Sequence, residues 1–280
     1  MTDTSLQQTL RALHPSLANC IVAFTLSGTA NNVAKVRSGR QSLAVRRMSP
    51  VRDAATPRSV EREIWLTLHQ QSIAPELLHW DSVHQFCISK WIDADGAPSS
   101  AQLVPLLVTL HTSPAPDSCP QIDILQGIRF YLDELAIPVS DFLPHFQQLL
   151  ATLELSQLNT GLCHNDLVAG NLINDGSQLW LIDFEYSGIN HPYFDVCSAW
   201  MTFVDPKESL NDFAKAYLTA IEREFNETEH QALASAYELS LWLGLLWAAA
   251  KQPDWRSQYE QRLNKIDHPV TQWLLVQLGQ

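Results

Sequence analysis

The chain has 280 residues, of which 46% are hydrophobic and 17% are charged, and this composition excludes an intrinsically disordered chain. Its formal net charge of -12 argues against nonspecific binding to nucleic acid or anionic lipid, although a local basic cluster and a metal ion can still bind a polyphosphate. The 5 cysteines are widely spaced and odd in number, which argues against a disulfide framework or a zinc site and favours a reducing, cytoplasmic location.

The first third of the chain predicts a small β-rich region with one main helix. Alternating apolar residues and turn residues predict three strands within residues 21–48. Residues 59–70 follow as a helix, with Ser59 as its expected N-cap. Two further strands are expected at 77–81 and 85–92.

After Asp93 the composition changes, and residues 95–98 predict a connection between two lobes. The longest apolar run, Leu239 to Ala250, is too short to cross a bilayer and predicts a buried helix, so no membrane insertion is expected. Helices are expected at 101–111, 122–135, 140–155, 206–224, 228–250 and 255–264. The pattern predicts an α+β protein with a small antiparallel β lobe at 1–92 and a larger, mostly helical lobe at 93–280.

The segment 163–195 interrupts the helices and reads CHNDLVAGNLINDGSQLWLIDFEYSGINHPYFD. Residues 172–174 and 179–182 predict two strands. The Asp175-Gly176 pair between them suits the positive φ angles of a tight hairpin turn. The segment therefore predicts a β-hairpin whose two ends lie side by side.

Three oxygen-bearing side chains flank this predicted hairpin. Asp166 and Asn171 come before it and Asp183 comes after it, so the hairpin should bring all three to one point. Carboxylate and amide oxygens are the ligands that Mg²⁺ takes while it keeps water and substrate phosphates. Phosphoryl transfer needs such a metal and a carboxylate near the attacking hydroxyl. Each residue alone is typical of a turn, but the three in this order favour a kinase site.

The motifs HNDLVAGNL and LIDFEYSGINHPYFD resemble the choline/ethanolamine kinase and aminoglycoside phosphotransferase superfamily, which has thiamine-kinase-like relatives and shares the protein-kinase-like two-lobed fold. The resemblance implies that Asp166 is the catalytic base or the residue that orients the hydroxyl, and that Asn171 and Asp183 hold magnesium. It also implies that His164 braces the catalytic loop and that Glu185 supports the metal or the acceptor site.

The nucleotide site is predicted in the N-terminal lobe, because in kinase-like folds a hairpin loop covers the phosphates and a basic residue on the third strand reaches them. Arg46, in the strand LAVRRM, stands where such kinases usually carry lysine, and it keeps the charge. Glu63 in the following helix is expected to hold Arg46, in preference to Glu61. The phosphate-covering loop is predicted at Ser27, Gly28 and Thr29.

The acceptor site is predicted in the helical lobe, where tryptophans are frequent. Aromatic faces beside carboxylates suit a cationic alcohol, because the face of an aromatic ring attracts positive charge. Trp242 and Trp247 are the candidates, although both lie in so apolar a helix that packing in the core is the alternative. Glu238, one turn before Trp242, needs a partner there, either a cationic substrate or a salt bridge.

These features predict an ATP- and Mg²⁺-dependent kinase that phosphorylates a hydroxyl of choline or a related amino alcohol. Thiamine and aminoglycosides are the alternative acceptors, and GTP stays open as an alternative donor. A catalytically inactive, ligand-binding relative is disfavoured because Asp166, Asn171 and Asp183 are all present. A protein kinase is disfavoured because no long activation segment follows Asp183. No nucleic-acid partner is expected, and the oligomeric state stays open.

Overall fold

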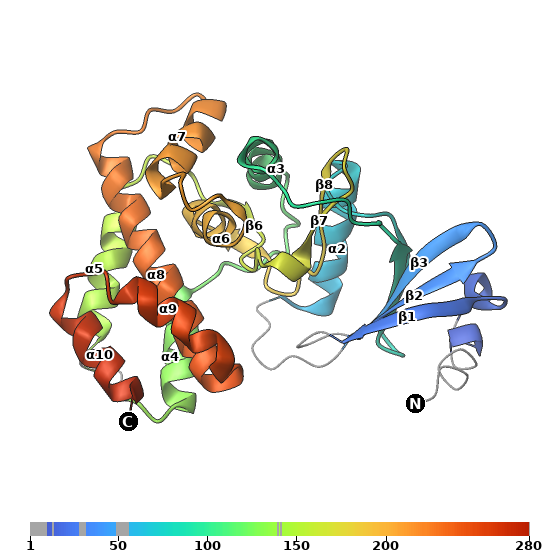
Figure 1. Cartoon of the computed structure of the whole chain (residues 1–280), viewed down its shortest axis with the longest axis horizontal. Helices are drawn as coiled ribbons and strands as arrows, with labels where there is room; N and C mark the ends of the chain where they lie inside the picture. The colour runs from blue at the N-terminus through green and yellow to red at the C-terminus, as the bar shows by residue number, and fades with distance from the viewer. Residues whose placement is uncertain are drawn as a thin grey trace.

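The structure, a computed structural model, describes residues 10–12, 14–27, 32–48, 56–138, 140 and 142–279. Figure 1 shows a sheet at one end of the molecule, helices at the other, and short strands between them. This arrangement confirms the predicted α+β, two-lobed architecture with a small antiparallel β part. The division at residue 92 stays a prediction.

The smaller lobe contains one antiparallel sheet with the strand order β1-β2-β3-β5-β4. Val36, Val45 and Ile88 cover one face of this sheet and pack with Leu17 of the N-terminal segment. Since side chains alternate along a strand, Arg46 points to the opposite face, toward the following helix. The strands are β1 (Ile21–Ser27), β2 (Asn32–Ser38), β3 (Gln41–Arg47), β4 (Leu77–Asp81) and β5 (Phe86–Lys90).

Helix α2 (Arg58–Gln70) follows the third strand. Its buried residues Ile64 and Trp65 belong to the hydrophobic core of the larger lobe, whereas the sheet has a small core of its own. The prediction of Ser59 as N-cap is wrong, because Pro57 occupies the cap and Ser59 lies within the first turn. Proline has no side-chain acceptor, so α2 begins without a side-chain cap.

The larger lobe is mainly helical, and the predicted helices correspond to α3, α4, α5, α7, α8 and α9. The sequence did not predict α6 or α10. By length and composition alone α8 could cross a membrane, but 61% of its most apolar window is buried inside the molecule, as in a core helix. The helices are α3 (Ser100–Thr112), α4 (Ile124–Glu134), α5 (Leu143–Leu153), α6 (Tyr193–Phe203), α7 (Leu210–Ala220), α8 (Glu227–Lys251), α9 (Arg256–Leu263) and α10 (Pro269–Gly279).

Two small antiparallel sheets lie between the lobes (Figure 1). Strand β6 (Gly161–Cys163) pairs with β9 (Gly188–Asn190), and β7 (Leu172–Asn174) pairs with β8 (Leu179–Leu181). The second pair is the predicted hairpin, and its Gly176 has the expected positive φ of 86°. The hairpin is bound on both sides, because the N–H of Leu181 donates to Ile73 beyond α2 and the N–H of Asp95 donates to Asn174.

Candidate active site

The loop between β6 and β7 carries Asp166 and Asn171. Asn171 ends a short 3-10 helix, and its Nδ2 donates to Oδ2 of Asp166 at 2.7 Å and to the backbone carbonyl of Asp166 at 2.9 Å. These two bonds fix the amide orientation, so its Oδ1 faces away from Asp166. Within the described part of the chain, that oxygen accepts no hydrogen bond and is available as a ligand.

Asp183 follows β8 and reaches the same point. The N–H of Ile182 donates to the carbonyl of Asn171 at 3.0 Å, which fixes the end of β8 against the loop. Asp183 has a φ of 68°, an uncommon value for a residue with a side chain, and the chain turns sharply there. The structure thus brings the predicted residues Asp166, Asn171 and Asp183 together. Their individual roles stay predictions.

The pKa of Asp166 is raised to about 6, chiefly because burial disfavours its charged form. The nearby carboxylate of Asp183 raises this pKa further, whereas His164 and the hydrogen bond from Asn171 lower it. A carboxylate with a pKa near neutrality can take up a proton more readily than an ordinary aspartate.

His164 is buried beneath the loop and connects it to β8. Its Nε2 lies 3.0 Å from the carbonyl oxygen of Ile182, and its Nδ1 accepts a hydrogen bond from the N–H of Asp166 at 3.3 Å. This pattern places the proton on Nε2. The geometry suits the bracing role that the resemblance implies.

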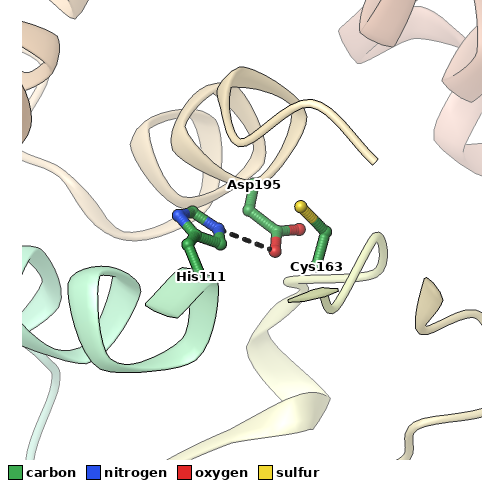
Figure 2. A group of neighbouring side chains, drawn as sticks. All are labelled: His111, Cys163 and Asp195. Carbon is green, nitrogen blue, oxygen red and sulfur yellow. Dashed lines mark hydrogen bonds and ion pairs between the residues drawn. The ribbon is translucent and has the colours of Figure 1, made fainter. Parts of the chain in front are cut away.

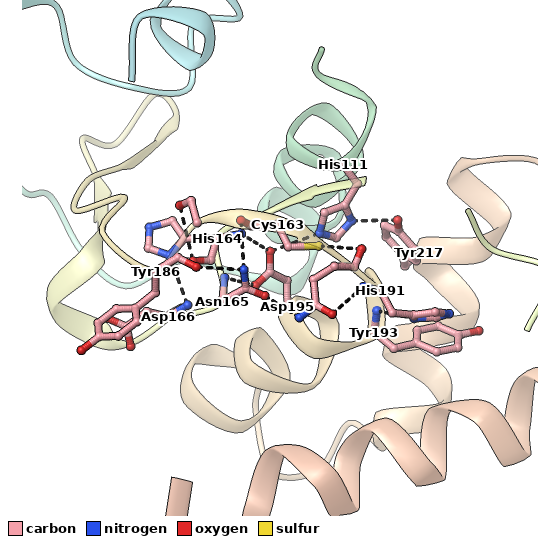
Figure 3. A network of polar contacts seen from close by, with 12 residues as sticks. His111, Cys163, His164, Asn165, Asp166, Tyr186, His191, Tyr193, Asp195 and Tyr217 are labelled. Carbon is pink, nitrogen blue, oxygen red and sulfur yellow. Dashed lines mark hydrogen bonds and ion pairs between the residues drawn. The ribbon is translucent and has the colours of Figure 1, made fainter. Parts of the chain in front are cut away.

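Asp195, in the first turn of α6, holds the loop from the other side (Figure 3). Its side chain is fully buried, with Oδ2 accepting the N–H of His164 at 2.6 Å and Oδ1 accepting that of Asn165 at 2.8 Å. Sequence reasoning did not assign it a role. A usable signal was present, because an acidic residue three positions after a proline is typical of the first turn of a helix.

Asp195 also lies near His111 and Cys163, and the ligand atoms of the three residues are within 4.8 Å of one another (Figure 2). Both carboxylate oxygens already accept backbone hydrogen bonds, and Nδ1 of His111 lies 2.8 Å from the hydroxyl of Tyr217. Burial and the adjacent Asp195 raise the pKa of the Cys163 thiol, which disfavours the thiolate that a metal would need. The cluster therefore supports the loop instead of binding an ion.

Arg46 enters the site from β3 and binds two carboxylates. Its Nη2 donates to Oε1 of Glu61, and its Nη1 lies 2.5 Å from Oδ1 of Asp183. The prediction that Glu63 holds Arg46 is wrong, because Glu63 is exposed and accepts a hydrogen bond from Ser118. Glu61 shares the buried face of α2 with Ile64, and helical periodicity turns Glu63 away from it.

Glu185 lies at the contact between α2 and the segment after β8. Its side chain is buried, and its Oε2 lies 3.1 Å from Nη1 of Arg58, which also binds Glu61. This carboxylate is thus paired with the first turn of α2, and its predicted role at the metal or the acceptor stays a prediction. It therefore contributes to holding the lobes together.

The predicted phosphate-covering loop is only partly described. Ser27 ends β1 and pairs with Asn32 of β2. Gly28 and Thr29 lie outside the described residues, so the loop stays a prediction.

The two tryptophans predicted at the acceptor site differ in their surroundings. Trp242 is fully buried and packs edge-on against Phe146, so the acceptor prediction is wrong for it and the core alternative holds. Its Nε1 donates to Glu238, whose Oε1 also lies 2.7 Å from Nε2 of His145, so protein side chains supply the partners that Glu238 needs. Trp247 is partly buried, and its acceptor role stays a prediction.

Tyr259 of α9 borders the site, although sequence reasoning did not single it out. Its ring lies against α8 at Gly244, where an added Cβ would be 2.3 Å from the ring. Burial raises the pKa of the Tyr259 hydroxyl, and the charge of Asp166 raises it further, which places the two side chains near each other. The available signal was Gly244 itself, since a glycine inside an apolar helix often marks a close contact.

The chain is similar in sequence to known proteins. The model of the "Phosphotransferase enzyme family" matches residues 22–274. Ethanolamine kinase 2 of Mus musculus is 29% identical over 179 residues, which cover 52% of this chain and 46% of that protein. The matched stretches span less than half the length of such curated relatives.

Two solved structures share the fold. A choline/ethanolamine kinase family protein from Mesorhizobium loti superposes with a TM-score of 0.74 and 20% identity, covering 99% of both chains. A spectinomycin phosphotransferase in complex with ADP and spectinomycin gives a TM-score of 0.58 and 13% identity, covering 93% of this chain and 94% of that one.

Proposed function

Because the chain belongs to the phosphotransferase enzyme family, we propose that it transfers the γ-phosphoryl group of ATP to a hydroxyl of choline or a related amino alcohol such as ethanolamine. The observation that carries this proposal is the meeting of Asp166, Asn171 and Asp183 at one point beside Arg46. The choice of acceptor is supported by similarity to ethanolamine kinase and to a choline/ethanolamine kinase family protein. A cytoplasmic location suits the five free cysteines.

The donor atoms at this point suit Mg²⁺. Asp183 offers a carboxylate, and Asn171 offers the Oδ1 that no described residue uses. These are hard oxygen ligands, and two protein ligands leave room for water and phosphate oxygens around a magnesium ion. When bound, the ion would neutralise charge on the phosphate oxygens.

The other residues of the site orient the acceptor and its proton. Asn171 donates a hydrogen bond to Oδ2 of Asp166, which fixes the orientation of this carboxylate. His164 and Asp195 fix the backbone of the same loop. In the proposed reaction Asp166 accepts the proton of the substrate hydroxyl as that oxygen attacks the γ-phosphorus.

ADP release should separate the candidate acceptors. With choline, ethanolamine, thiamine and kanamycin tested in parallel, we expect kcat/KM for choline or ethanolamine to exceed the others by at least about tenfold, since a site fitted to a substrate rejects analogues that leave its polar groups unpaired. Activity on thiamine or kanamycin alone would contradict the proposed acceptor but would agree with a phosphotransferase activity. Absence of acceptor-dependent ADP release with all four would contradict the proposal.

The reaction should depend on the ionisation of Asp166. Because its pKa is raised to about 6 and the base must be deprotonated, kcat/KM should be constant at higher pH. It should fall about tenfold for each pH unit below about 6. A metal ion at Asp183 favours the carboxylate form of Asp166. The corresponding fall in kcat should therefore occur at a lower pH than the fall in kcat/KM. Steady-state kinetics across this range test the prediction, and a flat kcat/KM profile would contradict it.

A further inference from the structure

One contact that the proposed function leaves unexplained joins Arg46 to Asp183. Arg46 comes from β3 and Asp183 from the end of β8, so the pair connects two segments that are far apart in the sequence. Its distance of 2.5 Å makes it a close charge-assisted bond, and the Arg46 side chain is only 7% exposed. The carboxylate that the proposed function assigns to magnesium thus already binds a cation.

Two cations cannot share this carboxylate without repelling each other. The guanidinium occupies Oδ1 of Asp183 and reduces the negative charge that a metal would meet there. We propose that Arg46 occupies the metal-binding carboxylate of the nucleotide-free enzyme and is displaced from it when the metal arrives with nucleotide phosphates. This inference rests on the proposed function, because it takes Asp183 as a metal ligand.

Other contacts of Arg46 would keep its side chain in the site when it leaves Asp183. Its second nitrogen is held by Glu61, and its guanidinium lies 5.5 Å from the ring centre of Trp65 and 6.0 Å from that of Trp80. Its Nε is buried and has no hydrogen-bond partner in the part of the chain that the structure describes. The group is therefore anchored at one end and incompletely bonded, and phosphate oxygens could replace Asp183 as its partner.

The type of side chain at position 46 determines whether one residue can bind Glu61 and Asp183 at the same time. The planar fork of arginine contacts Glu61 and Asp183 at the same time, through different nitrogens. Lysine would present all its donors from a single nitrogen, so Glu61 and Asp183 would both have to approach one point. In the absence of nucleotide, metal binding should therefore be weak in this enzyme. Nucleotide should strengthen it, because the phosphates bind the guanidinium in place of Asp183.

Mn²⁺ binding to the full, nucleotide-free chain tests the proposal, measured by electron paramagnetic resonance of the free ion. Arg46→Met should bind Mn²⁺ about tenfold more tightly than the unsubstituted protein, because Asp183 loses its cationic partner. Arg47→Met is the matched control, since it removes the same charge from the exposed neighbouring position and should leave the affinity unchanged. ADP should strengthen Mn²⁺ binding more in the unsubstituted protein than in Arg46→Met.

Equal Mn²⁺ affinity of Arg46→Met and the unsubstituted protein, or an equal gain in Arg47→Met, would overturn the proposal. If circular dichroism shows that Arg46→Met is not folded, Arg46→Lys decides the matter: a smaller gain in affinity supports the proposal and no gain overturns it. The measurement needs no acceptor and no turnover. A gain in Mn²⁺ affinity without acceptor-dependent ADP release would contradict the proposed function alone. Acceptor-dependent ADP release without a gain in Mn²⁺ affinity would contradict this inference alone.

Discussion

Substitution of Asp166 by asparagine should lower kcat by about a thousandfold, because the substrate hydroxyl loses the group that accepts its proton. The asparagine has nearly the same shape and can still contact Asn171, so the loop should keep its structure. Nucleotide affinity should change little, since Asp183 and Arg46 remain in place. Steady-state ADP release and equilibrium binding of ADP measure the two effects separately.

Asp117→Asn is the control for this substitution, because Asp117 is an exposed carboxylate on the connection after α3. It should keep the kcat of the unsubstituted protein. Retention of most of the activity by Asp166→Asn would show that Asp166 is not the base. Loss of ADP affinity together with kcat would instead indicate that Asp166 mainly organises the nucleotide site.

Substitution of Asp195 by alanine should lower the free energy of unfolding by about 3 kcal/mol, because it leaves buried hydrogen-bond donors without an acceptor. Two of these donors are the backbone N–H groups of His164 and Asn165, which precede the proposed base. The loop would lose its orientation, so kcat should fall as well. Urea denaturation followed by circular dichroism measures the change in stability.

Asp212→Ala gives the matched control for stability. Asp212 also lies in the first turn of an 11-residue helix, but it is exposed. Its loss should change the free energy of unfolding by less than about 1 kcal/mol, the size of a solvent-exposed helix-end interaction. Asp195→Asn keeps one acceptor oxygen and should be less destabilising than Asp195→Ala. Equal stability of Asp195→Ala and Asp212→Ala would contradict the structural role.

The hairpin beside the site was predictable because its signals are local. The Asp175-Gly176 pair sets the turn, and the short apolar stretches on both sides set the strands. Once the turn is fixed, the meeting of Asn171 and Asp183 follows from the pairing of β7 with β8. The sheet of the smaller lobe followed from the same kind of alternation and turn chemistry.

The remaining differences between prediction and structure have two causes, a helical periodicity that was not applied to Glu61 and Glu63, and packing between elements that no local pattern fixes. The periodicity of α2 could have selected Glu61 over Glu63, since Glu61 lies on the apolar face with Ile64. The burial of Trp242 was harder to predict, because α8 is apolar on more than one side and its orientation depends on packing against α4, α5, α6 and α9. The partners of Asp195 lie in a loop 30 residues away, which only the tertiary structure brings near.

The position of α2 determines the order in which parts of the molecule unfold on heating. Ile64 and Trp65 are buried in the core of the larger lobe, and Leu181 is hydrogen-bonded to Ile73 just beyond the helix. Cutting the chain near residue 92 would leave each fragment with an incomplete hydrophobic interior. The helix and the helical lobe should therefore melt in one cooperative transition, while strands β1 to β3, which share a small core with Phe86 and Ile88 of β5, can open earlier at lower free energy.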